Sequence, residues 1–247
     1  MNIEGLASGL LGNSFVDTSR KALRPFRDLL NSYYPLEPNV TAAILDLRHL
    51  TRVVRKGCPL YHENDPITFF TVMNLGTAFD FKTTGRDARQ ILSLKRSGEP
   101  LCLDSFFKGK AAHGVRAITD VEVIDVSRPD FEDLLDRFPV VHAALTRHLC
   151  AETRRLKSWL TNVGRNDSYA RVANFLCEFA SRCAEEPCEA FSFPLKQEQL
   201  GDILGLTAVH INRTLAKLVA DGVIERGKGW IQIRDWPQLS ATAGHVS

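Results

Sequence analysis

Two stretches of helical periodicity lie next to each other in the C-terminal third of the chain. Their apolar residues recur at helical spacing, at Leu195, Leu200, Ile203 and Leu204 in the first and at Ile211, Leu215, Leu218 and Val219 in the second. Only Gly205, Leu206 and Thr207 separate the two stretches. Gly205 suits a left-handed helix C-cap, and Thr207 suits an N-cap whose hydroxyl accepts from the next turn. The pattern predicts a helix-turn-helix.

The apolar period changes after Gly222, where residues 223–226 and 230–233 read as two short strands. Gly227, Lys228 and Gly229 lie between them and supply the permissive backbone that a hairpin turn needs. A hairpin that directly follows the second helix of a helix-turn-helix is predicted to be a wing.

The outward face of the second predicted helix carries side chains that suit a DNA major groove. Arginine reads guanine through two hydrogen bonds, asparagine suits adenine, valine contacts a thymine methyl group and lysine meets phosphate. An exposed arginine and lysine on a helix usually indicate only a solvated surface, so the prediction of DNA binding depends on the order helix, turn, helix, wing. The predicted DNA-contacting residues are Lys196, Gln197, Thr207, Val209, His210, Asn212, Arg213, Lys217 and Lys228.

The first half of the chain has a different pattern, in which short strands alternate with turn residues. Strands are predicted at 51–54, 69–73, 78–82, 89–94, 114–118 and 121–126, after a helix at 40–49. Regular short strands of this kind indicate a β-roll or barrel. Before them, residues 1–35 predict a flexible arm with one short helix at about 21–33.

A long helix is predicted from about 140 to 163, with apolar residues close to the spacing of a coiled-coil seam. These residues are Val141, Leu145, Leu149, Leu156, Trp159 or Leu160, and Val163. The helix could pack only on its own roll, or it could pair with a second copy. Residues 164–167 end it, and Asp167 is a predicted N-cap for a helix at 168–184.

The run FPLKQEQLGDILGLTAVHINRTLAKLVADGVIERG closely resembles the DNA-binding motif of the Crp/Fnr superfamily of bacterial transcription regulators. Upstream, RKGCPLYHENDP, GEPLCLDSFF and HGVRAITDVEVIDVSRPDFEDLL are similar to its cyclic-nucleotide-binding β-roll of jelly-roll type. The resemblance covers about residues 36–239. It implies an α+β chain with an N-terminal arm at 1–35, a β-roll sensor at 36–139, a dimerisation helix at 140–163 and a winged helix-turn-helix at 164–247. It also implies a homodimer on an inverted-repeat promoter operator, and RNA polymerase as a partner.

The resemblance places the effector pocket at Gly98, Glu99, Leu156 and Lys157. In cyclic-nucleotide binders of this superfamily an Arg-Ser pair holds the cyclic phosphate, but Ala111 and Ala112 stand at those positions here. A polar Thr-Ser pair that meets the base is replaced by Leu156 and Lys157. We therefore expect no cyclic AMP binding of the family's kind, and a structural role for Glu99 in a turn.

The composition of the chain says little about what the protein binds, but it indicates in which cellular compartment the protein is expected. The formal net charge of +2 is too small to indicate nucleic acid by itself. No apolar run is long enough for a bilayer or a signal peptide, so we expect a cytoplasmic chain without a membrane partner. The six cysteines should be reduced there, and Cys183 and Cys188 are candidates for a thiol switch.

No catalytic motif, metal-ligand spacing or cofactor motif is present, so we expect neither an enzyme nor a bound metal or cofactor. An alternative function is a ligand-binding regulatory subunit whose winged helix contacts protein. The base-reading character of the second helix argues against this alternative.

Overall fold

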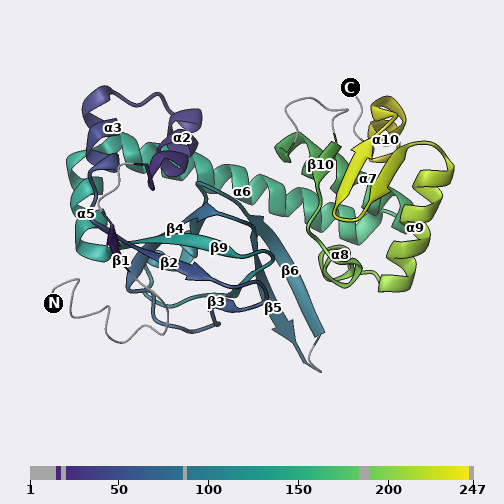
Figure 1. Cartoon of the computed structure of the whole chain (residues 1–247), viewed down its shortest axis with the longest axis horizontal. Helices are drawn as coiled ribbons and strands as arrows, with labels where there is room; N and C mark the ends of the chain where they lie inside the picture. The colour runs from purple at the N-terminus through teal and green to yellow at the C-terminus, as the bar shows by residue number, and fades with distance from the viewer. Residues whose placement is uncertain (1–14, 18–20, 86–87, 184–189, 245–247) are drawn as a thin grey trace. The chain divides into compact units, whose positions relative to one another are not determined.

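The computed structural model describes residues 15–17, 21–85, 88–183 and 190–244. The chain divides into two compact units, one formed by residues 1–87 and 92–154 and the other by residues 88–91 and 155–247 (Figure 1). No helix in the described part of the chain is long and apolar enough to cross a membrane.

Two antiparallel sheets form the roll. The five-stranded sheet has the order β1 (Phe15–Asp17), β2 (His49–Val54), β9 (Val121–Ser127), β4 (Phe69–Leu75) and β7 (Pro100–Leu101). The four-stranded sheet has the order β3 (Pro59–Tyr61), β8 (Gly114–Ala117), β5 (Ala78–Thr84) and β6 (Ala88–Lys95). The predicted roll is confirmed. Asn64, in the turn after β3, has a φ of 72°, the left-handed backbone that asparagine tolerates.

Helices cover one end of the five-stranded sheet, where α2 (Arg24–Tyr33), α3 (Pro38–Leu45) and α5 (Arg128–Arg137) lie (Figure 1). Four buried phenylalanines from different elements meet there, Phe26 of α2, Phe70 of β4, Phe106 of α4 (Leu103–Phe106) and Phe131 of α5. The rings of Phe70 and Phe131 stack with centroids 3.5 Å apart. The short helix predicted before residue 36 is therefore part of the core of the roll.

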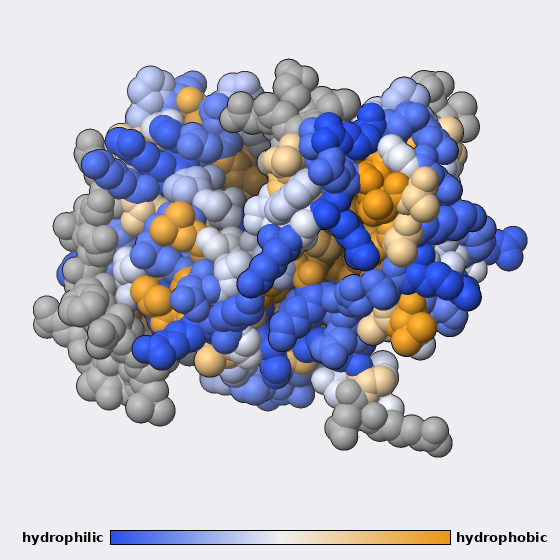
Figure 2. All heavy atoms as spheres, turned by 45° about the vertical axis from the view of Figure 1, so that its right-hand side comes forward, coloured by the Kyte–Doolittle hydropathy of each residue, from blue (hydrophilic) through white to orange (hydrophobic). Residues whose placement is uncertain are grey.

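The long helix α6 (Pro139–Arg165) confirms the predicted helix, and its predicted seam residues differ in burial. Leu149, Trp159 and Val163 are half-buried. Val141 and Leu145 are buried in the core of the roll, as packing on the helix's own roll requires. Leu156 and Leu160 are 47% and 75% exposed. The face of the molecule that Figure 2 shows is largely hydrophilic, with scattered apolar patches. Leu156 and Leu160 are two large exposed apolar side chains one turn apart on one helix.

The second unit is a winged helix. It contains α7 (Ser168–Cys183), α8 (Gln197–Leu204), α9 (Ala208–Ala220) and α10 (Trp236–Thr242), with a three-stranded sheet of order β10 (Ala190–Ser192), β12 (Trp230–Ile233) and β11 (Ile224–Gly227). Asp167 caps α7, since its Oδ1 accepts from the backbone N–H of Ala170 at 2.9 Å. The predicted winged helix is confirmed. The elements that were not predicted are β1, β3, β7, α4, β10 and α10.

A cluster of ionisable side chains is buried between β5, β6, the segment before β8 and α6. Lys95 Nζ lies 2.6 Å from Glu152 Oε1 and 3.5 Å from Asp80 Oδ2. His113 Nε2 lies 3.5 Å from the same Asp80 oxygen, to which Ser93 donates a hydrogen bond of 2.6 Å. The charge on Lys95 is thus shared by a carboxylate of the sheet and a carboxylate of α6.

Burial opposes charge on every member of this cluster, and the opposite charges outweigh it. Desolvation works to raise the pKa of Asp80 and of Glu152, but Lys95 holds the pKa of both carboxyls below its usual range. Desolvation works to lower the pKa of His113, but the hydrogen bond to Asp80 and its charge raise that pKa. Each charge is therefore tolerated only because its partners are present.

We predict that Lys95→Met lowers the free energy of unfolding of the roll by about 3–5 kcal/mol at neutral pH, because the buried Asp80 and the half-buried Glu152 lose the lysine between them and keep only a histidine neighbour each. Hydrogen exchange of β5 and β6 amides measures this local stability. Lys82→Met is the matched control, since Lys82 pairs with Glu63 at 2.9 Å on the surface and should contribute less than about 1 kcal/mol.

The difference in free energy of unfolding between the wild type and Lys95→Met should become smaller as the pH falls from 7 toward about 4. In the wild type, carboxyls with lowered pKa values contribute stability above their unfolded pKa and lose it as the pH falls. In the variant, desolvation raises their pKa values, so protonation relieves the buried charge. An equal difference in free energy of unfolding at pH 7 and at about pH 4 would contradict this account.

Candidate nucleic-acid interface

The two motif helices are joined by a turn whose residues act as predicted. Gly205 has φ 64° and ψ 38°, the left-handed C-cap conformation, and its N–H bonds the carbonyl of Gly201. Thr207 is the N-cap of α9, and its hydroxyl accepts from the backbone N–H of His210 at 3.3 Å. Both predicted caps are confirmed. At the start of α8, Lys196 occupies the N-cap and its N–H donates to the side chain of Gln199 at 2.8 Å.

Gly201 allows the two helices to approach closely, a role that the sequence analysis missed. A Cβ atom at this position would lie 2.4 Å from the carbonyl oxygen of Leu206, closer than atoms in contact can be. The backbone of α8 and the turn therefore touch directly. A glycine inside an otherwise helical apolar pattern was the available signal.

The apolar faces of α8 and α9 form the core of the unit, with one correction. Leu200, Ile203, Leu204, Ile211, Leu215 and Leu218 are buried as predicted. Val219 was assigned to the buried stripe but is 40% exposed, and Thr214 is buried instead. Thr214 is three residues after Ile211 and four before Leu218, so it lies on the inner face despite its hydroxyl. Val219 lies one position beyond this face.

The predicted DNA-contacting residues of α9 share one exposed surface. Val209 is 77% exposed, and His210, Asn212, Arg213 and Lys217 are exposed as well. Arg213 makes no hydrogen bond or ion pair with any residue that the structure describes, so its guanidinium is available to a partner. Lys217 Nζ lies 4.8 Å from the centre of the Tyr169 ring.

Tyr169 links α7 to the end of α9. Its hydroxyl donates to Asp221 Oδ2 at 2.7 Å. Burial and the Asp221 carboxylate raise the pKa of Tyr169 to about 12. The phenol therefore stays protonated at neutral pH and keeps its hydrogen bond to Asp221. Lys217 lies beside this hydrogen bond, over the Tyr169 ring.

The wing is a hairpin whose turn is one residue shorter than predicted. Gly227 pairs with Trp230, so the turn consists of Lys228 and Gly229, and Gly229 has a φ of 80°. Lys228 is exposed at the tip. Arg234 forms an ion pair with Glu225 on the same hairpin.

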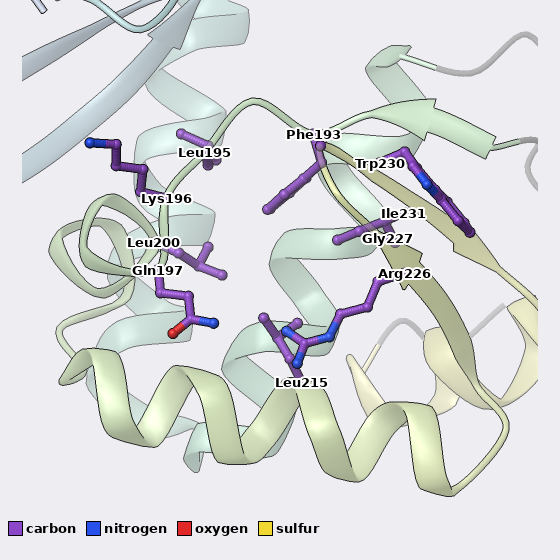
Figure 3. Close-up of a pocket in the computed structure, with 11 residues that line it drawn as sticks. Phe193, Leu195, Lys196, Gln197, Leu200, Leu215, Arg226, Gly227, Trp230 and Ile231 are labelled. Carbon is purple, nitrogen blue, oxygen red and sulfur yellow. The ribbon is translucent and has the colours of Figure 1, made fainter.

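A cavity of about 160 Å³ lies between the wing, the start of α8 and α9. Apolar side chains form its floor, among them Phe193, Leu200, Leu215 and Ile231. In Figure 3, Arg226 extends from β11 toward the helix that carries Leu215, and Gln197 reaches out from α8. The exposed Lys196 and Gln197 and the half-buried Arg226 thus give the cavity a polar rim beside the outward face of α9.

Comparisons with known proteins agree with this geometry. The family model of the Crp-like helix-turn-helix domain matches residues 170–242, and that of the cyclic nucleotide-binding domain matches residues 51–138. The chain belongs to the Crp/Fnr superfamily. It is a DNA-binding transcription regulator of this type.

Several relatives of this Crp/Fnr regulator align over most of its length. The transcriptional regulatory protein btr of Bordetella pertussis is 26% identical over 78% of this chain and 81% of its own. The transcriptional activator protein FnrL of Cereibacter sphaeroides is 27% identical over 79% of this chain and 81% of its own. The structure of FixK2 from Bradyrhizobium japonicum has a TM-score of 0.73 at 25% identity and covers 81% of this chain and 99% of that one.

The regulator's predicted effector-pocket residues have structural partners or face solvent. Glu99 is buried, and its carboxylate accepts from the backbone N–H of Arg96 at 3.0 Å. Gly98 has a φ of 86°, and a Cβ there would lie 2.4 Å from the carbonyl oxygen of Pro25. Leu156 and Lys157 are exposed on α6. Glu99 and Gly98 thus shape a turn against the segment that begins α2.

The two alanines that replace the family's Arg-Ser pair offer no side-chain donor. Ala111 is buried, and the backbone N–H of Ala112 already donates to Ser105 Oγ at 3.0 Å. Lys108 and Lys110 are exposed. Among the described residues, no three His, Cys, Asp or Glu side chains come together as a metal site would require.

The predicted thiol switch cannot be placed. Cys188 and the side chain of Cys183 lie outside the described residues, although α7 ends at Cys183. The free cysteines in the described part are Cys58, Cys102, Cys150 and Cys177. Burial raises the pKa of Cys177 to about 11, so this thiol is protonated at neutral pH.

We predict that Gly201→Ala destabilises the winged helix by about 1–3 kcal/mol and weakens DNA binding, because the new methyl group forces α8 away from the turn. Thermal unfolding, followed by tryptophan fluorescence, measures the loss. Gly164→Ala is the matched control, since its Cβ would meet nothing within 4 Å. In α6 this change should be neutral or stabilising by up to about 1 kcal/mol. Equal effects of the two substitutions would exclude the proposed close contact.

Proposed function

We propose that this regulator is a cytoplasmic homodimer that inserts α9 of each copy into successive major grooves of an inverted-repeat promoter operator. The exposed face of α9 carries this proposal, above all Arg213, whose guanidinium has no partner among the described residues. Because α9 is capped and packed on α8, this face is presented by a rigid element. Arg213 and Val209 contact bases, while Lys217, Lys228, Lys196 and Gln197 contact the phosphate backbone.

The effector of the regulator is not cyclic AMP in this proposal. The positions that hold the cyclic phosphate in the family's nucleotide binders carry Ala111 and Ala112, and neither can replace an arginine's paired donors. The bound regulator contacts RNA polymerase, as the family resemblance implies. DNA binding is its activity, and no reaction is assigned to it.

Selection of bound sequences from random duplex DNA, with purified protein and no added ligand, tests the function. We expect an inverted repeat whose half-sites lie about one helical turn apart, or roughly 34–36 Å. Addition of cyclic AMP should leave the enriched sequence and its affinity unchanged. Absence of any enriched sequence, with or without cyclic AMP, would contradict sequence-specific DNA binding.

We predict that Arg213→Ala costs about 1–3 kcal/mol of binding free energy and relaxes the preference at one base pair of each half-site. Lys217→Ala should weaken binding to all sequences alike, and should reduce the dependence of affinity on salt by about one phosphate contact. Titrations on the selected operator and on single-base variants, at several salt concentrations, separate the two effects. A uniform loss with Arg213→Ala would contradict its assignment to a base.

We predict that Leu160→Glu converts the homodimer to a monomer, because a charge would enter the apolar seam that Leu156 and Leu160 form on α6. Sedimentation velocity measures the oligomeric state. Ser158→Glu adds the same charge about half a helical turn away, on the opposite side of the helix, and should leave the dimer intact. A Leu160→Glu protein that remains dimeric would place the seam elsewhere.

A further inference from the structure

A single asparagine on α9 connects three elements of the DNA-binding unit. Asn212 Oδ1 accepts a hydrogen bond of 3.1 Å from Gln197 Nε2 at the start of α8. The same oxygen accepts a hydrogen bond of 3.3 Å from a guanidinium nitrogen of Arg226 on β11. The recognition helix, the first motif helix and the wing therefore meet at one amide oxygen.

Arg226 fixes the orientation of the Asn212 amide. The guanidinium of Arg226 can only donate, so the atom of Asn212 that faces it must be the oxygen, and the Gln197 amide in turn directs its nitrogen to this oxygen. The amide nitrogen then faces away from them, and it has no hydrogen bond with the residues that the structure describes. Asn212 is exposed, so this nitrogen is presented to a partner as a donor.

An asparagine in this orientation does not match adenine. Recognition of adenine in the major groove requires the amide to accept from N6 and donate to N7 at the same time. The oxygen of Asn212 is already occupied by Gln197 and Arg226 and points away from the free nitrogen. Guanine offers two acceptors, N7 and O6, on the same edge, and therefore suits a group that only donates.

Arg226 is better restrained than an ordinary surface arginine. Its side chain is half-buried and crosses the cavity floored by Phe193, Leu200 and Leu215, where the apolar stem is supported (Figure 3). Its remaining N–H groups are all donors. Arg226 thus adds donors beside Asn212 and limits rotation of the amide.

We propose that Arg226 is a specificity-determining residue of the DNA interface, which positions Asn212 with its donor outward and so makes the regulator select guanine over adenine at the base pair that Asn212 faces. This inference rests on the proposed function, since it requires α9 to enter the major groove. Arg226 acts here through Asn212, and no phosphate contact by Arg226 is needed.

The test is selection from random duplex DNA with the full-length wild type, Asn212→Ala and Arg226→Met. Asn212→Ala should abolish the preference at one base pair of each half-site, which identifies the base pair that Asn212 faces. In the wild type this base pair should carry guanine. Arg226→Met keeps the apolar stem and removes the donors, so the ratio of guanine to adenine at that base pair should fall about fivefold or more, with other positions unchanged.

Arg234→Met is the matched control. It removes the same charge from the same hairpin, but Arg234 pairs with Glu225 and not with Asn212, so it should not alter the base preference. If Arg226→Met does not fold, Arg226→Lys keeps the charge but loses the planar fork, and it should shift the preference in the same direction.

Two results would overturn the inference. The first is adenine at the Asn212 base pair in the wild type. The second is a uniform loss of affinity in the Arg226 variants with no change in base preference, as a phosphate contact or a purely structural role would give. Failure of the proposed function is distinguishable from both, because the wild type would then enrich no sequence at all.

Discussion

The contact of α8 with the turn before α9 constrains the whole DNA-binding unit. Gly201 leaves no room for a Cβ atom beneath the carbonyl of Leu206, and Gly205 and Thr207 cap the two helices within the same turn. With so little chain between the helices, the close backbone approach at Gly201 constrains how α8 and α9 can be oriented. This contact determines which residues of α9 pack against α8, and the residues on the opposite side of α9 are then the exposed ones.

The hydrogen-bonding groups on the outer face of α9 cannot be inferred from each residue alone, because contacts with neighbouring elements determine which donors and acceptors remain available. Arg213 has no partner among the described residues and keeps all its donors, whereas Asn212 has its oxygen occupied by Gln197 and Arg226. The cavity floor supports the stem of Arg226, so apolar packing beneath the wing affects the polar chemistry at its rim. Base preference is therefore a property of the helix and the wing together.

The sequence predicted features that depend on local chemistry and missed those that depend on distant contacts. Caps such as Gly205 and Thr207 act within one turn of helix, so composition and spacing were sufficient to find them. Val219 was misplaced because the apolar spacing extends one residue past the buried face. The strand β10 is short and pairs with β12 some forty residues later, so no local alternation indicated it. Arg226 and Asn212 are likewise joined only in the folded chain.

The buried cluster in the roll shows the same dependence on distant partners. Lys95 lies on β6, and its partner Glu152 lies on α6, three residues before Arg155, where the part of that helix that belongs to the second unit begins. Removal of one partner from such a pair costs about 3–5 kcal/mol, comparable with the free energy that separates conformational states. A change in charge at Asp80 or Lys95 therefore alters the electrostatic environment of Glu152 on α6. The ion pair between Lys95 and Glu152 thus connects the buried charges of the roll to α6, whose residues are divided between the two units.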